Sequence, residues 1–402
     1  MSDFYQTGVI TTLHRLGRPS LDRIEVELLH FSRTRPVALV LPALYSEFEG
    51  PAMPKIVEEL AKVKYLCELV LVLDKASEKE FQKVRQFMAP ITGGVKIIHN
   101  DGKRILEIYD TFKRNGLSVG DRGKGRSAWL AYGYVIASGK CDVIALHDCD
   151  IVSYSRELLS RLCYPVANPN LDYVFCKGYY SRVTNKMHGR VTRLLVTPLI
   201  RSLRTLGGEH RFLAFIDSFR YPLAGEFAMH TDMARVNRIP WDWGLEVGSL
   251  AEVYRNYSPR RVCQVDIADT YEHKHQALSS EDPEKGLMKM TIDISKSIFR
   301  TLASEGVVFS EGFFKSLSVA YLRLAEDTLL KYEADAAING LEFDRHDEAK
   351  AVESFARAMT LAAETFMKDP MGTPLIPNWN RVTSAIPGIL DMLKKAVDED
   401  NK

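Results

Sequence analysis

The sequence predicts an α/β protein built on a doubly wound, mostly parallel sheet, followed by an α-helical C-terminal module. Two observations favour this fold class. Apolar runs of strand length alternate with helical runs through most of the chain, the order of parallel strands joined by crossover helices. From about Pro283 onward the pattern changes to long helices rich in Ala, Leu, Glu and Lys. We therefore expect an N-terminal extension (1–35), a sheet domain (36–282) and an α-helical region (283–402).

The expected elements follow one another in a regular order. Buried strands are predicted at residues 36–44, 66–74, 95–99, 171–178 and 262–267, and in a run that begins at residue 143 and ends at Asp148. Helices are predicted at residues 21–29, 52–64, 77–87, 128–137 and 156–162. The C-terminal helices are predicted at residues 292–303, 312–338, 346–367 and 382–397. They show no chemistry of their own, and we expect them to pack on the sheet domain or to form a dimer.

Composition excludes several classes of protein. The chain has 402 residues and 46% hydrophobic content, enough for a large core. Lys and Arg (53) balance Asp and Glu (52), so nothing indicates nucleic acid or an acidic membrane as partner. Six cysteines without a C-x-x-C pair are typical of reduced thiols. The chain starts without a signal-type segment and no apolar run approaches ~18 residues, so we expect a cytoplasmic location.

Two aspartates close the apolar run that begins at residue 143. Asp148 and Asp150 are separated by one residue, so on an extended chain both carboxylates point the same way. Ligands of open α/β sheets gather at the carboxyl ends of strands, and Mg²⁺ prefers such oxygens together with substrate phosphates. The pair therefore indicates a metal that holds a donor diphosphate. Equally, it could be a surface turn that caps the next helix, as Ser153 or Ser155 could also do.

The loops after the first two strands are candidates for nucleoside binding. They contain Pro42, Ala43, Leu44, Glu47 and Asp74, of which a carboxylate could pair with a base or a ribose. The motif G-x-G-x-x-G is absent, so NAD is not favoured.

A glycine-rich basic segment, residues 120–127, opens the helix predicted at 128–137. Such a segment can present backbone N–H groups and a lysine to phosphate, helped by the helix dipole. It lacks the spacing of a Walker A loop. Arg122 and Arg126 could belong to a solvated turn, whereas Lys124 lies between two glycines and is the stronger candidate.

Three further groups are ambiguous when taken singly. Arg190 and Thr192 could clamp an anion or could begin a helix with Thr192 as its cap. Glu226 follows Ala-Gly, which allows a close backbone approach to a ligand. Trp241 and Trp243 precede Glu246, an arrangement that suits a sugar, although core tryptophans are the more common explanation. Glu246 lies in an otherwise apolar helical run, where an unpaired carboxylate would be costly.

Two histidines follow the last predicted strand. His273 and His275 flank Lys274 at a point where the chain could return to the edge of the sheet. A lone histidine is usually structural, but this pair could supply a metal ligand through His273 and an anion contact through Lys274 or His275.

In their order along the chain these motifs resemble those of the glucosyl-3-phosphoglycerate synthases. The matching residues are 42–44, 123–125, 148–150, 189–192, 222–226, 244–248 and 272–273. Each motif is weak alone, while their number and order make chance agreement improbable, and together they cover roughly residues 36 to 280. The family consists of retaining glycosyltransferases of the GT-A nucleotide-sugar-binding fold that move glucose from a nucleotide donor to 3-phosphoglycerate.

The resemblance implies roles for individual residues. Asp150 and His273 are similar to the ligands of Mg²⁺ or Mn²⁺ in the family. Lys124, Asp148 and Glu246 are expected to act in catalysis and to contact the donor's diphosphate, ribose and glucose. The other expected donor contacts are Pro42, Ala43, Leu44, Glu47, Asp74 and Glu226, and the expected acceptor contacts are Arg190, Thr192 and His275.

Two departures from the family pattern affect specificity. The first loop reads Tyr45-Ser46-Glu47 where the family has Asn-Glu-Glu, and His275 stands where the family has an Asn. The donor could thus be UDP-glucose or GDP-glucose, and the alternatives include GDP-mannose as donor, free glycerate as acceptor, or a non-catalytic nucleotide-sugar sensor. The presence of Asp148, Asp150 and His273 argues against the sensor. Because dimers occur in the family, we expect a homodimer.

Overall fold

The structure is a computed structural model that describes residues 6, 8–17, 20–92, 94–272, 286–372 and 375–402. At its centre these residues form an eight-stranded sheet with the order β1-β8-β6-β7-β5-β2-β3-β4. The strands are β1 (Thr11–Leu13), β2 (Val37–Leu44), β3 (Leu66–Asp74), β4 (Val95–His99), β5 (Val143–Leu146), β6 (Phe175–Tyr180), β7 (Phe227–His230) and β8 (Val262–Ala268). Every paired strand is parallel to its neighbours except β7, which runs antiparallel to β5 and β6. The predicted mostly parallel sheet is confirmed.

The register of the central strands brings their carboxyl ends to one edge. Leu44 of β2 pairs with Asp74 of β3, and Leu73 pairs with His99 of β4, so these strands end almost level. Leu146, the last residue of β5, lies beside Val40 of β2. The segments that follow β2, β3 and β5 therefore leave the sheet side by side, which is where ligands bind in folds of this kind.

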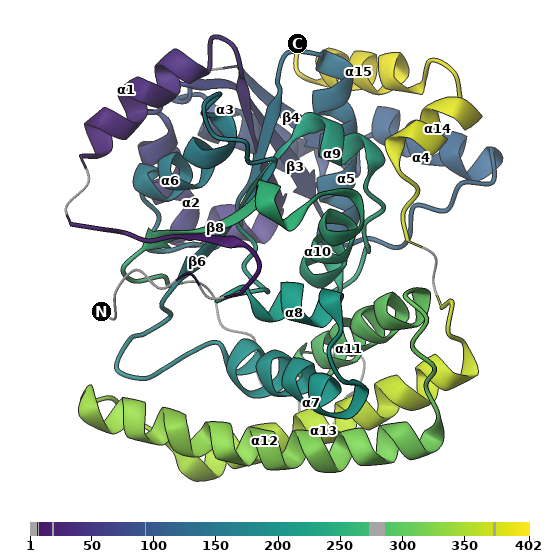
Figure 1. The fold of residues 1–402 in the computed structure, drawn as a ribbon. Coiled ribbons are helices and arrows are strands. Elements are labelled where there is room, and N and C mark those ends of the chain that lie inside the picture. The colour runs from purple at the N-terminus through teal and green to yellow at the C-terminus, as the bar shows by residue number, and fades with distance from the viewer. Residues whose placement is uncertain (1–5, 7, 18–19, 93, 273–285, 373–374) are drawn as a thin grey trace.

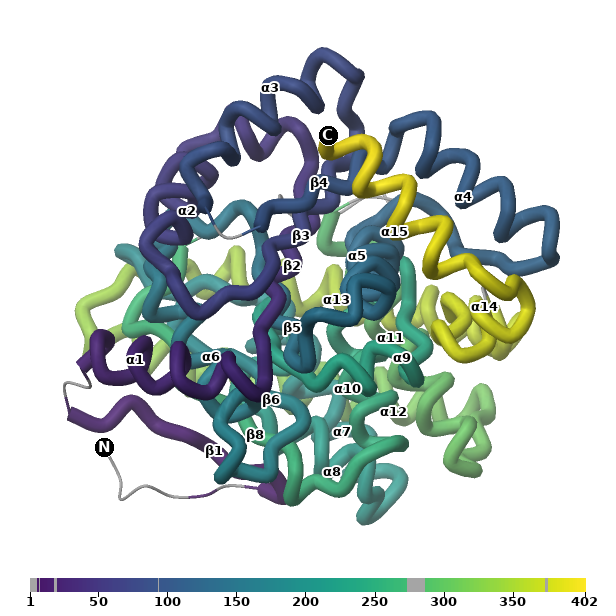
Figure 2. Tube along the Cα trace, turned by 90° about the horizontal axis from the view of Figure 1, so that it is seen from above, coloured from purple at the N-terminus to yellow at the C-terminus, as the bar shows by residue number. Residues whose placement is uncertain are grey.

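Helices cover both faces of the sheet (Figures 1 and 2). The helices are α1 (Leu21–Phe31), α2 (Ala52–Leu60), α3 (Glu78–Met88), α4 (Lys103–Arg114), α5 (Lys124–Ser138), α6 (Arg156–Ala167), α7 (Thr197–Gly207), α8 (Arg211–Asp217), α9 (Thr231–Val236), α10 (Leu245–Asn256), α11 (Gly286–Ser304), α12 (Glu311–Ile338), α13 (Arg345–Lys368), α14 (Trp379–Ala385) and α15 (Ile389–Asp400). Short helical turns are η1 (Tyr45–Glu49), η2 (Val191–Val196) and η3 (Pro259–Arg261).

The sheet divides the interior into two cores. Along β2, Val37, Leu39 and Leu41 face a core shared with α1, α2, α3 and α6, whereas Ala38 and Val40 face a core that includes α4 and α5. Successive side chains of a strand point to opposite faces, so a strand buried on both faces needs a continuous apolar run. This explains why β2 and β3 could be found in the sequence.

The C-terminal helices do not form one separate unit. Helices α11, α12 and α13 pack on each other and on η2 and α7, and make the lower layer of Figure 1. The chain then returns to the sheet, where α15 packs against α4, α5 and β4. The single helix predicted at residues 382–397 is wrong, because α14 and α15 are separated at Pro387 and Gly388; proline has no N–H to donate and Gly388 has a positive φ of 80°.

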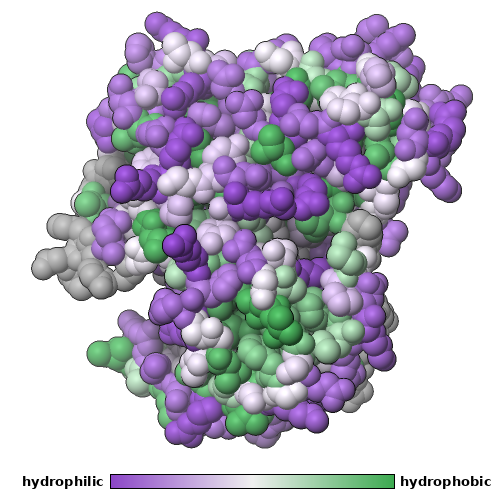
Figure 3. Space-filling view, turned by 45° about the vertical axis from the view of Figure 1, so that its right-hand side comes forward, coloured by the Kyte–Doolittle hydropathy of each residue, from purple (hydrophilic) through white to green (hydrophobic). Residues whose placement is uncertain are grey.

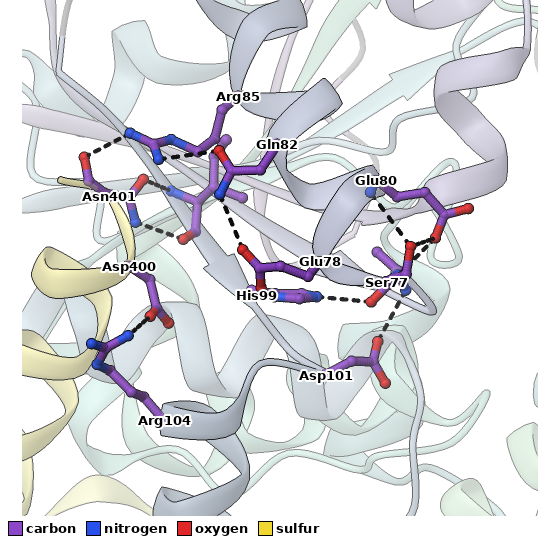
Figure 4. Close-up of polar contacts among 12 residues, drawn as sticks. Ser77, Glu78, Glu80, Gln82, Arg85, His99, Asp101, Arg104, Asp400 and Asn401 are labelled. Atoms are coloured by element: carbon purple, nitrogen blue, oxygen red, sulfur yellow. Dashed lines mark hydrogen bonds and ion pairs between the residues drawn. The ribbon is translucent and has the colours of Figure 1, made fainter.

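The end of the chain covers the exposed edge of β4 (Figure 4). The Asn401 side chain accepts a hydrogen bond from the backbone N–H of Ile97 at 2.9 Å and donates to its carbonyl at 2.8 Å. Arg85 donates to the Asn401 carbonyl at 3.2 Å, and Arg104 pairs with Asp400 at 2.5 Å. An unpaired strand edge is a site of aggregation, and α15 protects this one.

Several elements were not expected. Strand β1 has three residues and β7 has four, so neither gave a strong periodic signal, whereas α4 has apolar residues at helical spacing and its signal was overlooked. All six cysteines are free thiols. Among the described helices, none combines the length and apolar character needed to cross a bilayer.

Candidate active site

A cleft of about 910 Å³ opens at the carboxyl ends of β2, β3 and β5. Its opposite wall comes from α11 and from the turn between α12 and α13. The predicted site residues that line it are Pro42, Ala43, Leu44, Glu47, Asp74, Lys124, Asp148, Asp150, Arg190, Thr192 and Glu246. His273 and His275 lie outside the described residues.

Asp148 and Asp150 follow β5 and both face the cleft. Cys149 between them lies in a bend and is 3% exposed, while both flanking aspartates line the cleft. Ser155 is the N-cap residue of α6, and the N–H of Arg156, the first residue of the helix, donates to Oε2 of Glu59 at 3.2 Å, so neither aspartate is the N-cap residue of this helix. Burial, together with the Asp148 charge, raises the pKa of the Asp150 carboxyl to about 7.

Lys124 is the first residue of α5 and reaches across to two carboxylates. Its Nζ lies 2.5 Å from Oδ1 of Asp148 and 3.1 Å from Oε1 of Glu246. Burial alone would lower the pKa of Lys124, but these carboxylates outweigh it and hold the pKa well above its usual value. Three residues far apart in sequence are thus joined into one charged cluster at the floor of the cleft.

The glycines around Lys124 are required by close packing. A Cβ on Gly125 would overlap the backbone carbonyl of Pro240, and one on Gly120 would overlap the ring of Trp241. The segment that carries Trp241 therefore crosses directly over the start of α5. Trp243, 41% exposed, lines the cleft, whereas Trp241 is half-buried in the core.

Glu226 is not part of the cleft wall. It is fully buried just before β7, where it accepts hydrogen bonds from the hydroxyls of Tyr180 (2.7 Å) and Tyr271 (2.6 Å). The two tyrosine rings stack with centroids 3.7 Å apart. Burial and the Asp148 charge raise the pKa of Glu226 against the lowering effect of the two hydroxyls. Glu226 therefore lies beneath the charged cluster and does not face the space above it.

Asp74 ends β3 and is 4% exposed. Arg122 places Nε 3.1 Å from Oδ1 of Asp74 and also pairs with Asp101, which follows β4. Arg122 lies in an exposed bend, as the solvated turn allowed by the sequence requires, and it also lines the cleft. Acidic and basic groups thus stand side by side at the end of the cleft formed by β2 and β3.

Arg190 precedes η2, a π-helical turn that leads into α7. Its Nε donates to Oε1 of Glu348 at 2.7 Å. Thr192 lies within this turn and is 8% exposed, so it is not the cap of the helix.

The comparisons with known proteins are consistent with this geometry. The chain matches no protein-family model. It is 52% identical to the glucosyl-3-phosphoglycerate synthase of Persephonella marina, over 100% of this chain and 99% of that protein. It is 39% identical to the protein of the same name from Methanococcoides burtonii, over 100% and 98%. The chain belongs to the glucosyl-3-phosphoglycerate synthase family.

Solved structures of this family share the fold. One glucosyl-3-phosphoglycerate synthase from Mycobacterium tuberculosis, in complex with Mn²⁺, UDP-glucose and phosphoglyceric acid, has a TM-score of 0.54 at 18% identity and covers 75% of this chain and 89% of that one. Another, with Mg²⁺ and UDP, has a TM-score of 0.52 at 19% identity and covers 76% and 89%. The chain is therefore a glycosyltransferase with the GT-A fold predicted from the sequence.

The donor set suits a hard divalent cation. Asp148 and Asp150 offer carboxylate oxygens at a strand end that opens into the cleft, and such oxygens are preferred by Mg²⁺ and Mn²⁺. Within the described ranges no group of three or more His, Cys, Asp or Glu side chains forms a complete metal site. The two aspartates thus fit as part of the coordination shell of such a cation.

The structure adds cleft residues that sequence reasoning missed. The loop between β6 and η2 contributes Arg182, Lys186 and His188, and α13 contributes Glu348. Three basic residues in a short loop after a strand can be recognised in the sequence as a candidate anion site. Glu348 lies inside a region assigned to packing helices, where its signal is a charge in the buried stripe of α13.

Proposed function

We propose that this family member transfers glucose from a nucleoside diphosphate glucose to 3-phosphoglycerate, with retention at the anomeric carbon and with Mg²⁺ or Mn²⁺ as cofactor. The product is glucosyl-3-phosphoglycerate. The observation that carries the proposal is the Lys124–Asp148–Glu246 cluster beside Asp150, in one cleft with Arg190. The named relatives and the ligands bound in the mycobacterial structures support the choice of substrates.

In this proposal Asp150 and His273 hold the cation. A divalent cation bound there supplies positive charge against the donor's diphosphate. Lys124 supplies a second positive charge to the same leaving group. Because its ammonium is fixed by two carboxylates at 2.5 and 3.1 Å, it needs no reorganisation when the bond to the diphosphate breaks.

Asp148 and Glu246 orient the donor. The Lys124 ammonium holds one oxygen of each, and the other oxygens can accept from ribose or glucose hydroxyls. An ion-paired carboxylate is a weak nucleophile, which supports retention without a covalent intermediate: the acceptor hydroxyl attacks the anomeric carbon from the face that the diphosphate leaves, the bond to the diphosphate breaks, and the hydroxyl proton passes to the departing diphosphate oxygen. Glu226 stabilises the floor beneath them through Tyr180 and Tyr271.

The nucleoside belongs at the opposite end of the cleft, against Pro42, Ala43, Leu44, Glu47 and Asp74. Arg122 stands beside Asp74 and adds hydrogen-bond donors to its acceptors. Uracil and guanine each offer an N–H next to a carbonyl, so both bases can satisfy such a pair.

The acceptor's phosphate and carboxylate belong near Arg190 and Thr192, together with His275. Lys186 and Arg182 lie on the same wall and add positive charge. A guanidinium can hold two oxygens of a phosphate or carboxylate at once, which fixes the acceptor's direction of attack.

A panel assay tests the proposal. The protein is incubated with Mg²⁺, UDP-, GDP- or ADP-sugars, and either 3-phosphoglycerate or glycerate, and products are identified by mass and anomeric configuration by NMR. We expect an α-configured hexosyl product with 3-phosphoglycerate. The absence of product from every combination would overturn the proposed function.

Three further aspects complete the proposal. Free thiols at all six cysteines support a cytoplasmic location. Apolar side chains gather on the exposed surface of the lower, helical layer, which supports a homodimer through that layer (Figure 3). The product would feed the synthesis of glucosylglycerate, a compatible solute.

A further inference from the structure

The turn between α12 and α13 holds the loop that carries Arg190. The backbone N–H of Glu342 donates to the carbonyl of Asn185 at 2.8 Å. Glu348 binds two arginines, with Oε1 2.7 Å from Nε of Arg190 and Oε2 2.9 Å from Nη2 of Arg193. The acceptor side of the cleft is thus fixed by a region far away in the sequence.

Arg193 holds the Glu348 carboxylate in place. Its side chain is 10% exposed, lies 4.8 Å over the ring of Tyr332 and donates to the carbonyl of His188 at 3.0 Å. Glu348 is itself 5% exposed, so its carboxylate has little freedom. Arg190 is the more exposed partner, at 31%, and it lines the cleft.

The nitrogen of Arg190 that binds Glu348 determines which of its N–H groups remain for a ligand. Glu348 takes the Nε–H, which leaves the two Nη groups to bind two oxygens of an anion. A free arginine side chain loses rotamer entropy when it binds a ligand, whereas one held at Nε has already lost much of it. Glu348 therefore favours anion binding even though it is itself negatively charged.

We propose that Glu348 is a positioning residue for the acceptor: it fixes Arg190 so that both Nη groups face the anionic group of the acceptor. The inference rests on the proposed function and deepens it, because it makes the C-terminal helices part of the acceptor site. Glu348 contacts neither the donor nor the reacting carbon in this proposal, so its effect is confined to acceptor binding.

Glu348→Gln tests the proposal. The amide has one acceptor oxygen, and we expect the more buried Arg193 to keep it, so that Arg190 is no longer fixed. We expect the KM for 3-phosphoglycerate to rise about tenfold, the effect of losing one charge-assisted hydrogen bond. The donor KM and kcat should stay within about twofold. Glu353→Gln, an exposed acid on the same helix, is the matched control and should change none of these constants.

A double-mutant cycle separates positioning from a merely structural role. If Glu348 acts through Arg190, then Glu348→Gln should have no further effect on acceptor kcat/KM in an Arg190→Met background. Additive losses would overturn the proposal. Should Glu348→Gln prove too unstable at the assay temperature, Glu348→Asp retains the charge beside Arg193 but is one methylene shorter, and the same acceptor-selective rise is expected.

Binding of 3-phosphoglycerate, measured by calorimetry on the same proteins, distinguishes this inference from the proposed function. A wild-type protein that binds the acceptor but transfers no glucose would refute the proposed function alone. Equal acceptor affinity in the wild type and Glu348→Gln would refute the role of Glu348 alone. Weaker binding in Glu348→Gln, with Glu353→Gln unchanged, supports it.

Discussion

Lys177 of β6 should make the stability of the protein depend on pH in an unusual window. Its side chain is 1% exposed, and the ammonium donates to the carbonyl of Ala224 at 2.7 Å. Burial lowers the pKa of Lys177 from its ordinary value of 10.5 to about 8, although the charges of Glu246 and Glu226 oppose this. A positive charge is therefore held in the core directly behind the cleft.

The sign and size of the effect follow from linkage. Because the folded pKa is lower than the unfolded one, the unfolded chain binds more protons between these values, and the free energy of unfolding rises with pH across that window. The difference of about 2.5 units corresponds to roughly 3 kcal/mol at about 1.36 kcal/mol per unit. Below the folded pKa this stability is absent, since lysine is then charged in both states.

The assay compares the wild type with Lys177→Met by urea denaturation at several pH values. Distant groups that titrate in both proteins cancel in the difference, which leaves the titration of Lys177 and of the charged groups that it interacts with, Glu246 and Glu226 among them. We expect the wild type to gain about 2 to 3 kcal/mol relative to the variant between about pH 7 and about pH 10. Parallel pH profiles for the two proteins would refute a depressed pKa at Lys177.

Three other predictions concern the cleft. Lys124→Met should lower kcat by about 10²- to 10³-fold, the usual effect of removing one charge from a transition-state site, while circular dichroism shows an unchanged fold. Asp150→Ala and His273→Ala should each abolish metal-dependent transfer and weaken Mn²⁺ binding measured by calorimetry; full activity in either would remove the proposed metal site. Gly125→Ala should lower stability in urea by about 1–3 kcal/mol because its Cβ overlaps a backbone carbonyl, whereas Gly312→Ala, with nothing nearer than 3.8 Å, should be neutral or stabilising.

The sequence was most informative where one physical cause dominates. Strands β2 and β3 are buried on both faces, which requires unbroken apolar runs, and their loops begin at Leu44 and Asp74 as expected. Strand β7 was missed because four residues flanked by a glycine-containing turn carry no periodicity, and only pairing with β5 and β6 makes them a strand. Pairing between distant segments is not encoded in local pattern.

The same distinction holds for the site. The rule that ligands bind at the carboxyl ends of parallel strands predicted a common site for Asp74 and Asp148, and both line the cleft. Lys124 contacts both Asp148 and Glu246. These contacts depend on where α5 and α10 begin relative to β5, which is set by the tertiary structure and not by the local sequence. Glu348 did carry a weak signal: it precedes Ala351 and Val352 at helical spacing, so a charge occupies the buried stripe of α13.

The charges around the floor of the cleft explain why donor and cation should bind together. Asp148, Asp150, Glu226 and Glu246 place four carboxyl groups there beside the single ammonium of Lys124, and burial together with the Asp148 charge raises the pKa of Asp150 and of Glu226. A divalent cation bound there would offset the negative charge of the site and so favour the approach of the donor's diphosphate, which would in turn neutralise the cation. Binding free energies are reciprocal, so the factor by which the cation raises donor affinity must equal the factor by which the donor raises cation affinity. Without the cation, the donor's diphosphate would lie against the carboxylates of the cleft floor and be repelled. The coupling between cation affinity and donor affinity is therefore a property of the protein as well as of the nucleotide.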